Sequence, residues 1–355
     1  MKKILKRIYS AAPIRVNDIG GWTDTWFAGH GAVFNMAVSP FVEVQVSVYP
    51  FPGNREPVTL HLENFNDTYS LEPGQISYDR HPLIEAAVDS MEIPADISIE
   101  IDIFSKAPPG ASVGTSAAVS VALLGALDAL TPGRLTAHDA AALAHKIETE
   151  KLDLQSGIQD QLCSAYGGIN FIDMHSFPDA EVSPVPVPKE TLWDLEKRLV
   201  LVYIGTPHSS SEVHRKVIAD LGEDASRDPR MAGLRKCAAE ARDAAISGDL
   251  ALLGDVMNRS IDLQRALHPD LVCEKFDEII EIAGSYKACG CKVNGAGGDG
   301  GSITILTDGD VNKKREMERV LNEKGYHSIP VRLSPAGLRV WETLPAGGQP
   351  QTNIG

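Results

Sequence analysis

The stretch PPGASVGTSAA at residues 108–118 decides the fold, because it joins a glycine-containing turn to the start of an apolar helix. Residues 95–104 before it (ADISIEIDIF) alternate apolar and polar side chains, which predicts a strand. Residues 115–130 after it are rich in Ala and Leu and predict a buried helix of about four turns. Gly110 and Gly114 carry no Cβ atoms, and the first N–H groups of the helix have no intrahelical partner. The stretch therefore predicts a phosphate-binding turn.

Two common nucleotide-binding motifs do not fit this stretch. A P-loop requires a Lys directly before its hydroxyl residue, whereas Gly114 precedes Thr115 here. A Rossmann turn requires the pattern G-x-G-x-x-G, which this loop lacks. The simplest alternative is an ordinary strand-to-helix turn in which Thr115 or Ser116 only caps the helix. The stretch alone leaves phosphate binding and simple capping open.

Three other segments carry related signals: APIRVNDIGGWTD at residues 12–24, SGIQDQLCSAYGG at residues 156–168 and KVNGAGGDGGS at residues 292–302. Together with the first stretch, and in this order, they resemble the motifs of the GHMP kinase superfamily (galactokinase, homoserine kinase, mevalonate kinase and phosphomevalonate kinase). The resemblance covers residues 11–333. It implies an α+β fold with an N-terminal ribosomal-protein-S5-like domain and a C-terminal ferredoxin-like domain. It also implies ATP and Mg²⁺ as cofactors.

Within the superfamily, the motifs resemble those of sugar kinases. The sequence GGWTDT at residues 20–25 resembles L-fucose kinases, and GIQDQ followed by AYGG resembles D-glycero-D-manno-heptose 7-phosphate kinases. Galactokinases carry an acidic residue where this chain has Gly21, which argues against galactose as the acceptor. The resemblance therefore implies phosphorylation of a hydroxyl, the anomeric one by analogy, on a sugar or sugar phosphate.

The resemblance also implies roles for individual residues. Asp160 is the expected catalytic base, and Arg15 is the expected cation beside it. The expected ATP-binding residues are Pro109, Gly110, Ala111, Ser112, Gly114, Thr115 and Ser116. The expected acceptor-binding residues are Gly21, Trp22, Asp24, Gly297 and Gly298. The expected metal ligands are Ser116 and Glu148, with Glu150 as the competing carboxylate. Without the resemblance, Asp160 would be read as a helix cap, Arg15 as a surface residue and Glu148 as an exposed helix carboxylate.

Three other residues in or near these segments also have expected placements. Trp26 is expected in the core, since large aromatic residues are mostly buried. Asp299 interrupts the glycine run of the third loop, and a carboxylate beside phosphate would be repulsive unless it faces solvent or a cation. His208 follows an expected strand and could shape the acceptor pocket, a weaker prediction than the others.

The composition of the chain agrees with an enzyme that acts on small molecules. The net charge of −15 over 355 residues argues against non-specific binding to nucleic acid or to an anionic membrane, although a local basic patch could still hold ATP. No apolar run is long enough to span a bilayer, and the basic residues 1–10 lack a following hydrophobic signal core, so a cytoplasmic location is expected. The Cys count of 5 is odd and shows no C-x-x-C spacing, which indicates neither a disulfide framework nor a zinc site. The expected partner is the small-molecule sugar or sugar phosphate, with the protein a monomer or a homodimer.

The order of expected elements indicates two domains. Strands at residues 42–48 and 58–62 and helices at residues 82–90, 115–130 and 137–151 precede a Pro-rich connector at residues 183–188. A strand at residues 198–204, helices at residues 231–247, 250–267, 276–286 and 311–324, and strands at residues 302–306 and 328–333 follow it. We therefore expect domains at residues 1–188 and 189–344, with a flexible tail at residues 345–355.

Two other functions share this fold family and remain open at this stage. One is a non-catalytic sensor that binds sugar and nucleotide, although the matches at Asp160 and Arg15 count against it. The other is an ATP-dependent decarboxylase, which would yield carbon dioxide, ADP and phosphate instead of a phosphorylated sugar. The GGWTDT and GIQDQ segments favour the sugar kinase.

Overall fold

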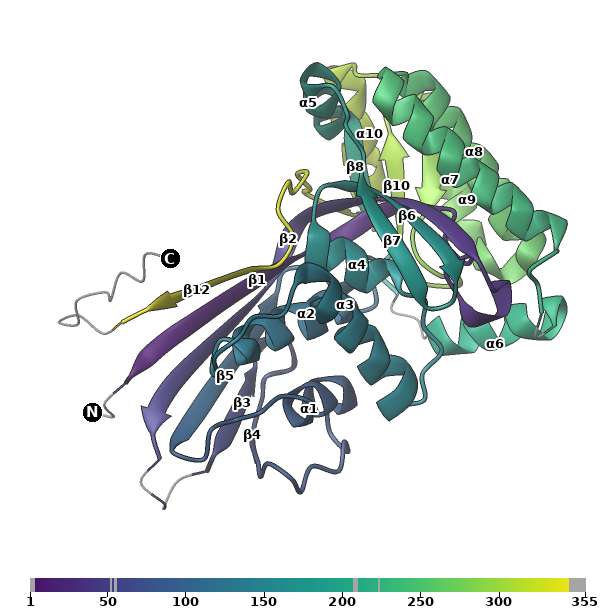
Figure 1. The fold of residues 1–355 in the computed structure, drawn as a ribbon. Helices are drawn as coiled ribbons and strands as arrows, with labels where there is room; N and C mark the ends of the chain where they lie inside the picture. The colour runs from purple at the N-terminus through teal and green to yellow at the C-terminus, as the bar shows by residue number, and fades with distance from the viewer. Residues whose placement is uncertain (1–3, 52, 54–55, 207–209, 223, 345–355) are drawn as a thin grey trace.

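Two sheets organise the chain (Figure 1). The structure, a computed structural model, describes residues 4–51, 53, 56–206, 210–222 and 224–344. Within these residues the first sheet has eight strands in the order β12-β1-β2-β5-β3-β4, with β6 and β7 continuing from β2. Its strands are β1 (Lys6–Ile19), β2 (Gly31–Pro50), β3 (Val58–Leu62), β4 (Asp67–Leu71), β5 (Ile97–Ser105), β6 (Ile169–Ser176), β7 (Asp179–Pro184) and β12 (Arg339–Thr343). The tail at residues 345–355 and His208 lie outside the described residues.

The long strand β2 explains the shape of this sheet. Its first part pairs with β6 and its second part with β5, so one strand joins two sections of sheet. The second part carries the alternating sequence VEVQVSV, with each Val buried and with Glu43 exposed. Alternation therefore identified this strand correctly, although it missed the 14-residue β1 and the C-terminal β12.

Helices cover one face of the first sheet. They are α1 (Pro82–Asp89), α2 (Thr115–Asp128), α3 (Ala137–Lys146) and α4 (Gln159–Tyr166), and α2 lies against both β1 and β2. Helix α2 is apolar on all sides and almost fully buried, as its Ala- and Leu-rich sequence predicts. Gly125 of α2 faces Leu338 and Val340, and an added Cβ would lie 2.8 Å from the Leu338 side chain. The end of the chain thus packs onto the helix that follows the first glycine loop.

The second sheet has the ferredoxin-like strand order. Its strands are β8 (Leu199–Tyr203), β9 (Gly290–Val293), β10 (Ser302–Leu306) and β11 (His327–Ile329), arranged β11-β8-β10-β9 and antiparallel. In chain order this is the β-α-β-β-α-β pattern of ferredoxin-like folds. Its helices are α5 (Lys189–Arg198), α6 (Ser210–Leu221), α7 (Pro229–Ser247), α8 (Leu250–Leu267), α9 (Glu274–Ser285) and α10 (Val311–Glu323). The expected α+β fold with a ferredoxin-like C-terminal half is confirmed.

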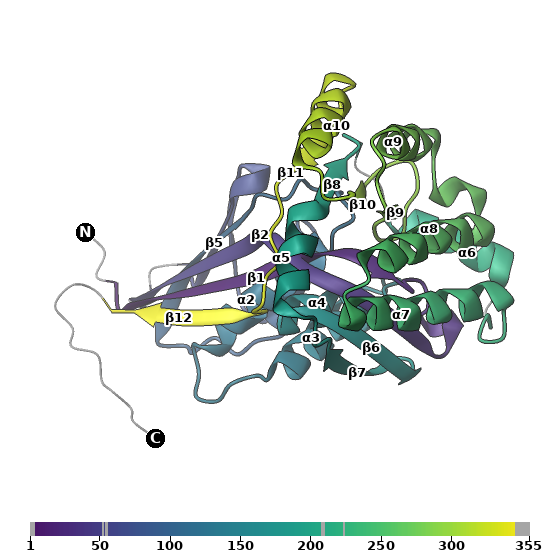
Figure 2. The same cartoon turned by 90° about the horizontal axis from the view of Figure 1, so that it is seen from above.

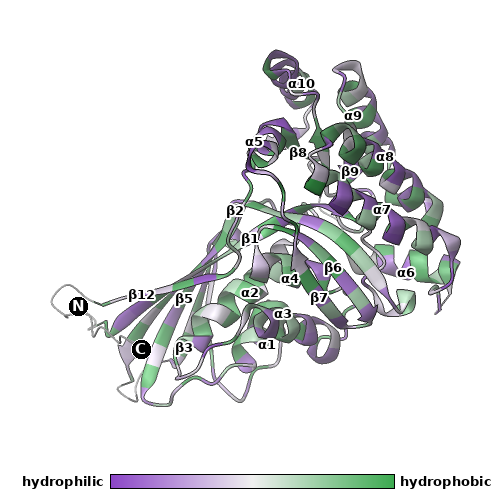
Figure 3. Cartoon of the chain, turned by 45° about the horizontal axis from the view of Figure 1, so that its top comes forward, coloured by the Kyte–Doolittle hydropathy of each residue, from purple (hydrophilic) through white to green (hydrophobic). Residues whose placement is uncertain are grey.

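Both faces of the second sheet are covered by helices (Figure 2). In β8, Leu199 and Leu201 belong to the core that includes α7 and α8, whereas Val200 and Val202 pack with α9 and α10. Helix α10 is mostly hydrophilic in Figure 3 and contributes few buried side chains to that core. Because β8 is buried on both sides, its sequence is continuously apolar (LVLVY) and not alternating.

The two halves are not separate along the chain. Strand β12, near the end of the expected C-terminal domain, pairs with β1 of the first sheet. Helix α7 packs against β2, so the hydrophobic core of the first sheet includes residues from α7 and α8. Among the described residues, no helix is long and apolar enough to cross a bilayer.

Candidate functional site

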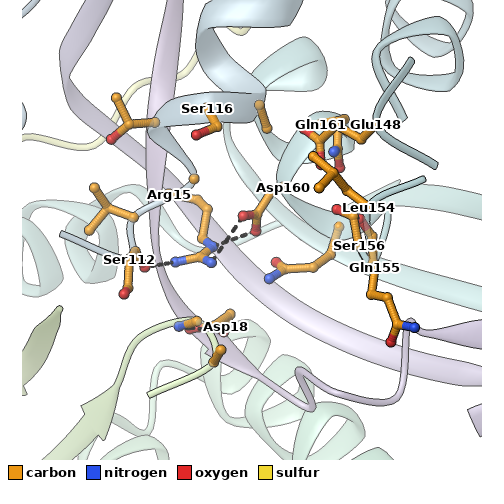
Figure 4. Close-up of a pocket in the computed structure, with 18 of the residues that line it drawn as sticks. Arg15, Asp18, Ser112, Ser116, Glu148, Leu154, Gln155, Ser156, Asp160 and Gln161 are labelled. Atoms are coloured by element: carbon orange, nitrogen blue, oxygen red, sulfur yellow. Dashed lines mark hydrogen bonds and ion pairs between the residues drawn. The ribbon is translucent and has the colours of Figure 1, made fainter. Parts of the chain in front are cut away.

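One cavity of about 660 Å³ brings the sequence motifs together (Figure 4). Its wall comes from the end of β1, the loop before α2, the turn between α3 and α4, the start of α4 and the loop after β9. The expected site residues in its wall are Arg15, Trp22, Asp24, Gly110, Ala111, Ser112, Gly114, Thr115, Ser116, Glu148 and Asp160. Arg15 and Gly295 are more than about 250 residues apart in the sequence, yet both line this cavity.

The loop before α2 is held in a conformation that exposes the start of the helix. Gly110 and Gly114 have positive φ angles of 72° and 69°, and Ser112 has φ 57°. A Cβ at Gly114 would lie 3.2 Å from Arg15 and 3.3 Å from Asp160, so a larger residue would press on these two side chains. Gly114 is also the N-cap of the 14-residue α2, and no side chain caps this end. The free N–H groups and the positive end of the helix dipole can therefore receive an anion.

Arg15 and Asp160 form the central ion pair of the cavity. Arg15 Nε donates to Asp160 Oδ1 at 2.7 Å, and Nη2 donates to Oδ2 at 3.1 Å. Arg15 Nη1 donates to the carbonyl oxygen of Ser112, which ties the pair to the first glycine loop. Burial raises the pKa of Asp160, and the charge of Arg15 opposes that shift. Arg15 is 3% exposed, whereas the Asp160 side chain is 27% exposed and faces the cavity.

A second charge pair lies beneath Arg15. Asp18 lines the cavity, and its carboxylate accepts hydrogen bonds from the backbone N–H of Gly295 at 3.0 and 3.2 Å. Lys292 Nζ lies 3.7 Å from Asp18 Oδ1 and donates to Gln264 Oε1 at 3.3 Å. Burial lowers the pKa of Lys292, and the charge of Asp18 opposes that shift. Our sequence reasoning missed both residues, although a charged residue within the apolar end of a strand was a signal.

The third glycine loop is fixed by buried hydrogen bonds. Asn294 Oδ1 accepts from the backbone N–H of Asn17 at 3.0 Å and from Thr304 Oγ1 at 2.9 Å. Ser302 Oγ accepts from Asn294 Nδ2 at 3.1 Å and donates to the carbonyl oxygen of Ala111 at 2.6 Å. The buried side chains of Asn294 and Ser302 therefore join the three glycine-containing loops.

Glu148, which is one of the two expected metal ligands, lines the cavity. It lies in a π-helical turn, Ile147–Lys151, that follows α3, and this turn directs it into the cavity while Glu150 stays outside. Glu150 is 64% exposed and pairs with Lys146 at 3.5 Å, so the geometry favours Glu148. Burial raises the pKa of Glu148 to about 7, and hydrogen bonds from Ser156 and Gln161 oppose that shift.

The cavity wall offers oxygen atoms of the kind that suit a magnesium ion. Thr115 Oγ1 and Gln161 Oε1 are buried in the cavity wall and have no hydrogen-bond partner among the described residues. Figure 4 shows Glu148 and Gln161 side by side, with Ser116 across the top of the cavity. Hard oxygen donors of this kind suit Mg²⁺, which keeps several waters and needs few protein ligands. The described residues hold no cluster of three or more His, Cys, Asp or Glu side chains that could bind a metal by themselves.

Another part of the cavity wall is built around Asp24. Its Oδ2 accepts from the backbone N–H of Gln159 at 3.1 Å, and burial raises its pKa to about 6. Gly157 packs so closely that an added Cβ would lie 2.1 Å from Asp24 Oδ2. Trp22 meets His214 edge to face at 4.8 Å between ring centroids. This part of the wall therefore combines a carboxylate with aromatic rings, and our sequence reasoning had not selected His214.

Some expected residues lie outside this cavity wall. Gly21 is buried beside Asp18, and an added Cβ would lie 2.9 Å from the Asp18 carboxylate, so an acidic side chain there would be repelled. Gly297 packs against the backbone of Leu271, where a Cβ would lie 2.1 Å from the carbonyl oxygen, and Gly298 pairs with Val272. These two glycines allow close packing between backbones, while Gly295 is the glycine of this loop that reaches the cavity.

Trp26 differs in position from its expectation, whereas Asp299 takes one of its two expected placements. Trp26 was expected in the core, but it is 39% exposed and packs edge-on against the buried Phe27. That expectation was wrong because Trp26 opens a short 3₁₀ turn whose buried side chains are Phe27 and Ala28. Asp299 is exposed, so its carboxylate faces solvent.

A second cavity of about 300 Å³ adjoins the first. The two share Pro82, Leu83, Gly110, Thr115 and Ser116, so they meet at the first glycine loop. The second is also lined by Pro109, by aromatic residues and by apolar strand residues. Pro109, an expected ATP-binding residue, thus lines the second cavity and not the first. The mostly apolar lining suits a flat heterocycle connected to phosphates at the loop.

Comparisons with known proteins agree with this arrangement. Residues 82–168 match the family described as GHMP kinases N terminal domain, and residues 241–327 match GHMP kinases C terminal. The chain is 26% identical, over 90% of its length, to the bifunctional fucokinase/GDP-fucose pyrophosphorylase of Arabidopsis thaliana, of which it spans only 31%. It is 30% identical to the mevalonate kinase of Pyrococcus horikoshii, with 78% of each chain covered. A crystal structure of a D-glycero-D-manno-heptose 1-phosphate kinase from Bacteriodes thetaiotaomicron has the same fold, with a TM-score of 0.72 at 21% identity, covering 94% of this chain and 98% of that one.

Proposed function

This chain belongs to the GHMP kinase family, and from that premise we propose that it transfers the γ-phosphoryl group of ATP to a hydroxyl of a sugar or sugar phosphate. The observation that carries the proposal is the buried pair of Arg15 and Asp160 beside the exposed start of α2. A carboxylate next to an anion site is what phosphorylation of a hydroxyl requires, because the hydroxyl must lose a proton as it attacks phosphorus.

Asp160 is the proposed proton acceptor. Its side chain faces the cavity, and the two hydrogen bonds from Arg15 orient the carboxylate and favour its ionised form. Burial works against ionisation, so the charge of Arg15 keeps the base active near neutral pH. Arg15 also brings positive charge to the place where the transferred group becomes more negative.

The phosphates of ATP are proposed to lie at the loop before α2. The first N–H groups of α2 have no side-chain cap, and Gly110 and Gly114, which line the cavity, leave room for phosphate oxygens. Ser116 and Glu148 would hold Mg²⁺, which supplies charge neutralisation of the phosphates when bound. The adjoining apolar cavity would hold the adenine base.

The acceptor is proposed to lie beside Asp24. A carboxylate can accept hydrogen bonds from sugar hydroxyls, and Trp22 can stack on a sugar face. The GGWTDT sequence and the fucokinase relative support a sugar over mevalonate. A cytoplasmic location and a monomeric or homodimeric state are part of this proposal, and both follow from sequence expectations alone.

The proposal is tested by ADP release from ATP and Mg²⁺ with a panel of free sugars, sugar phosphates and mevalonate. An Asp160→Asn variant keeps the shape of the side chain but cannot accept the proton, so a sugar-dependent signal should disappear. Product analysis separates the alternatives: a phosphorylated sugar supports the kinase, whereas carbon dioxide with ADP and phosphate supports the decarboxylase. ATP binding without turnover on any acceptor would favour the sensor.

A further inference from the structure

The described wall of the whole cavity, including the proposed acceptor site, is poor in positive charge. Four carboxylates line the cavity: Asp18, Asp24, Glu148 and Asp160. Of the described residues, only Arg15 brings a Lys or Arg side chain to the wall. Its guanidinium already donates to Asp160 and to the Ser112 carbonyl. A second phosphate or a carboxylate on the acceptor would therefore meet like charge without a cation to pair with.

The hydrogen-bonding groups at the proposed acceptor site require a partner that can donate. Gln155 Oε1 lies buried in the wall and has no hydrogen-bond partner among the described residues. Asp24 has a carboxylate that accepts from the Gln159 backbone and can accept further hydrogen bonds. A sugar hydroxyl donates one hydrogen bond, whereas a phosphate dianion only accepts. Buried acceptors that face a phosphate would therefore remain unsatisfied.

The same site also offers a donor and an apolar surface. Trp22 Nε1 is buried without a hydrogen-bond partner in the described part of the chain, and the indole ring meets His214 edge to face. His214 Nδ1 lies 2.9 Å from the carbonyl oxygen of Gln155, so this nitrogen carries the hydrogen. A hydroxyl can accept from the indole N–H and donate to Gln155 or Asp24, while the sugar ring lies against the indole.

We infer that the acceptor is an uncharged polyhydroxylated compound, that is, a free sugar and not a sugar phosphate or a carboxylate. The inference rests on the proposed kinase function and narrows its acceptor to one chemical class. Selectivity comes from two features together: carboxylates without a spare cation, and buried acceptors that only a donor can satisfy. Sites that depend on such polar groups discriminate strongly, since the wrong substrate leaves them unpaired.

The test compares matched acceptors with the full-length protein, ATP and Mg²⁺. The pairs are D-mannose and its 6-phosphate, D-galactose and its 6-phosphate, and D-glycero-D-manno-heptose and its 7-phosphate, with L-fucose, D-glucuronate and mevalonate added. We expect kcat/KM for the best neutral sugar to exceed that of every phosphorylated or carboxylated acceptor by about 100-fold or more. A charged acceptor that is as good or better would overturn the inference and leave the kinase function intact. No turnover with any acceptor would overturn both.

Two variants test whether this part of the cavity wall determines the preference for a neutral acceptor. Gln155→Lys adds an ammonium group at the proposed acceptor site and should shift the ratio of neutral to phosphorylated kcat/KM by about 10-fold towards the phosphorylated partner. Trp22→Phe keeps an aromatic ring but removes the N–H, and should raise KM for the neutral sugar about 5-fold with little change in kcat. Trp193→Phe is the matched control, because Trp193 is 63% exposed and outside both cavities. An unchanged ratio in Gln155→Lys would refute the assignment of this wall.

Discussion

Replacing Arg15 should separate its effect on the base from its effect on binding. Arg15→Met removes the charge and all three donors while filling much of the same volume, whereas Arg15→Lys keeps the charge but loses the planar, two-pronged contact with Asp160. Because Arg15 is buried and contacts Ser112 of the first loop, both variants also test whether the pair holds that loop in place.

The expected magnitude follows from the contacts. Arg15 makes two charge-assisted hydrogen bonds to Asp160, and such bonds contribute about 1.5–3 kcal/mol each. The Asp160 side chain is 27% exposed, so solvent screening favours the lower end of that range. A total of about 3 kcal/mol corresponds to a loss of roughly 100-fold in kcat/KM for Arg15→Met. Arg15→Lys retains the charge and should lose about 10-fold.

The pH profile distinguishes a lost base from a lost structure. Burial raises the pKa of Asp160 and Arg15 opposes this, so removing Arg15 should raise that pKa further. The acid limb of kcat/KM then moves to higher pH in Arg15→Met, and less so in Arg15→Lys. Part of the lost activity should therefore return in alkaline buffer.

The assay is steady-state ADP release between pH 5.5 and 9.5, with unfolding in urea measured alongside. Arg259→Met is the matched control: Arg259 pairs with Glu240 and Asp255 on the surface, outside both cavities, and its loss should leave kcat/KM unchanged. If Arg15→Met lost activity by the same factor at every pH, or kept its activity, the reasoning about the base would be wrong.

Three further changes give independent expectations. Burial raises the pKa of Glu148 from its usual 4.5 to about 7. Between these two values the folded state holds a proton that the unfolded state releases. The free energy of unfolding of the metal-free protein should therefore fall by up to about 3 kcal/mol as the pH rises from roughly 4.5 to 7. In urea unfolding at pH 5 and pH 8, Glu148→Gln should reduce the fall in stability by up to about 3 kcal/mol and leave the part that comes from the raised pKa of Asp24. In Mg²⁺ titrations Glu148→Gln should raise the Mg²⁺ requirement about 10-fold, whereas Glu150→Gln should change neither the pH dependence nor the Mg²⁺ requirement. Gly157→Ala places a Cβ 2.1 Å from Asp24 Oδ2 and should raise acceptor KM at least about 10-fold with little change in KM for ATP; equal effects on both would refute this. Asp18→Asn leaves the buried Lys292 without its charge partner. The free energy of unfolding, measured in denaturant, should fall by about 2–3 kcal/mol. An unchanged unfolding midpoint would contradict this prediction.

The sequence predicted the elements that have a clear period and the loops that have a clear composition. Helices α7 and α8 and strand β10 lie where their apolar patterns placed them, since each has one well-defined buried face or is buried throughout. Strand β12 was missed because its five residues are all exposed, and its position depends on pairing with β1 more than 300 residues earlier. Helix α5 was missed because it directly follows the Pro-rich connector, whose last residue is its N-cap.

The site residues could be predicted where a sequence motif fixes the backbone. They could not be predicted where the tertiary structure decides which of two nearby residues faces the cavity. The loops around Arg15, Gly114 and Asp160 are recognisable because glycine or charge is required at each of them. The choice between Glu148 and Glu150 depends on a π-helical turn that adds one residue to the helical spacing, and no composition signal marks it. His214 comes from α6 in the other half of the chain, so only the packing of that helix brings it beside Trp22.

The buried contacts explain why the site needs both halves of the protein. Asn294 and Ser302 frame a loop between strands of the second sheet, yet their side chains bond to Asn17 and Ala111 of the first half. Lys292 likewise reaches the Asp18 carboxylate across the same boundary. Neither half alone can satisfy these buried groups, and an unsatisfied buried polar group costs about 1–3 kcal/mol. The loops that we propose to bind the phosphates, and the Arg15–Asp160 pair that we propose to remove the proton, are therefore fixed by the same contacts that join the two sheets.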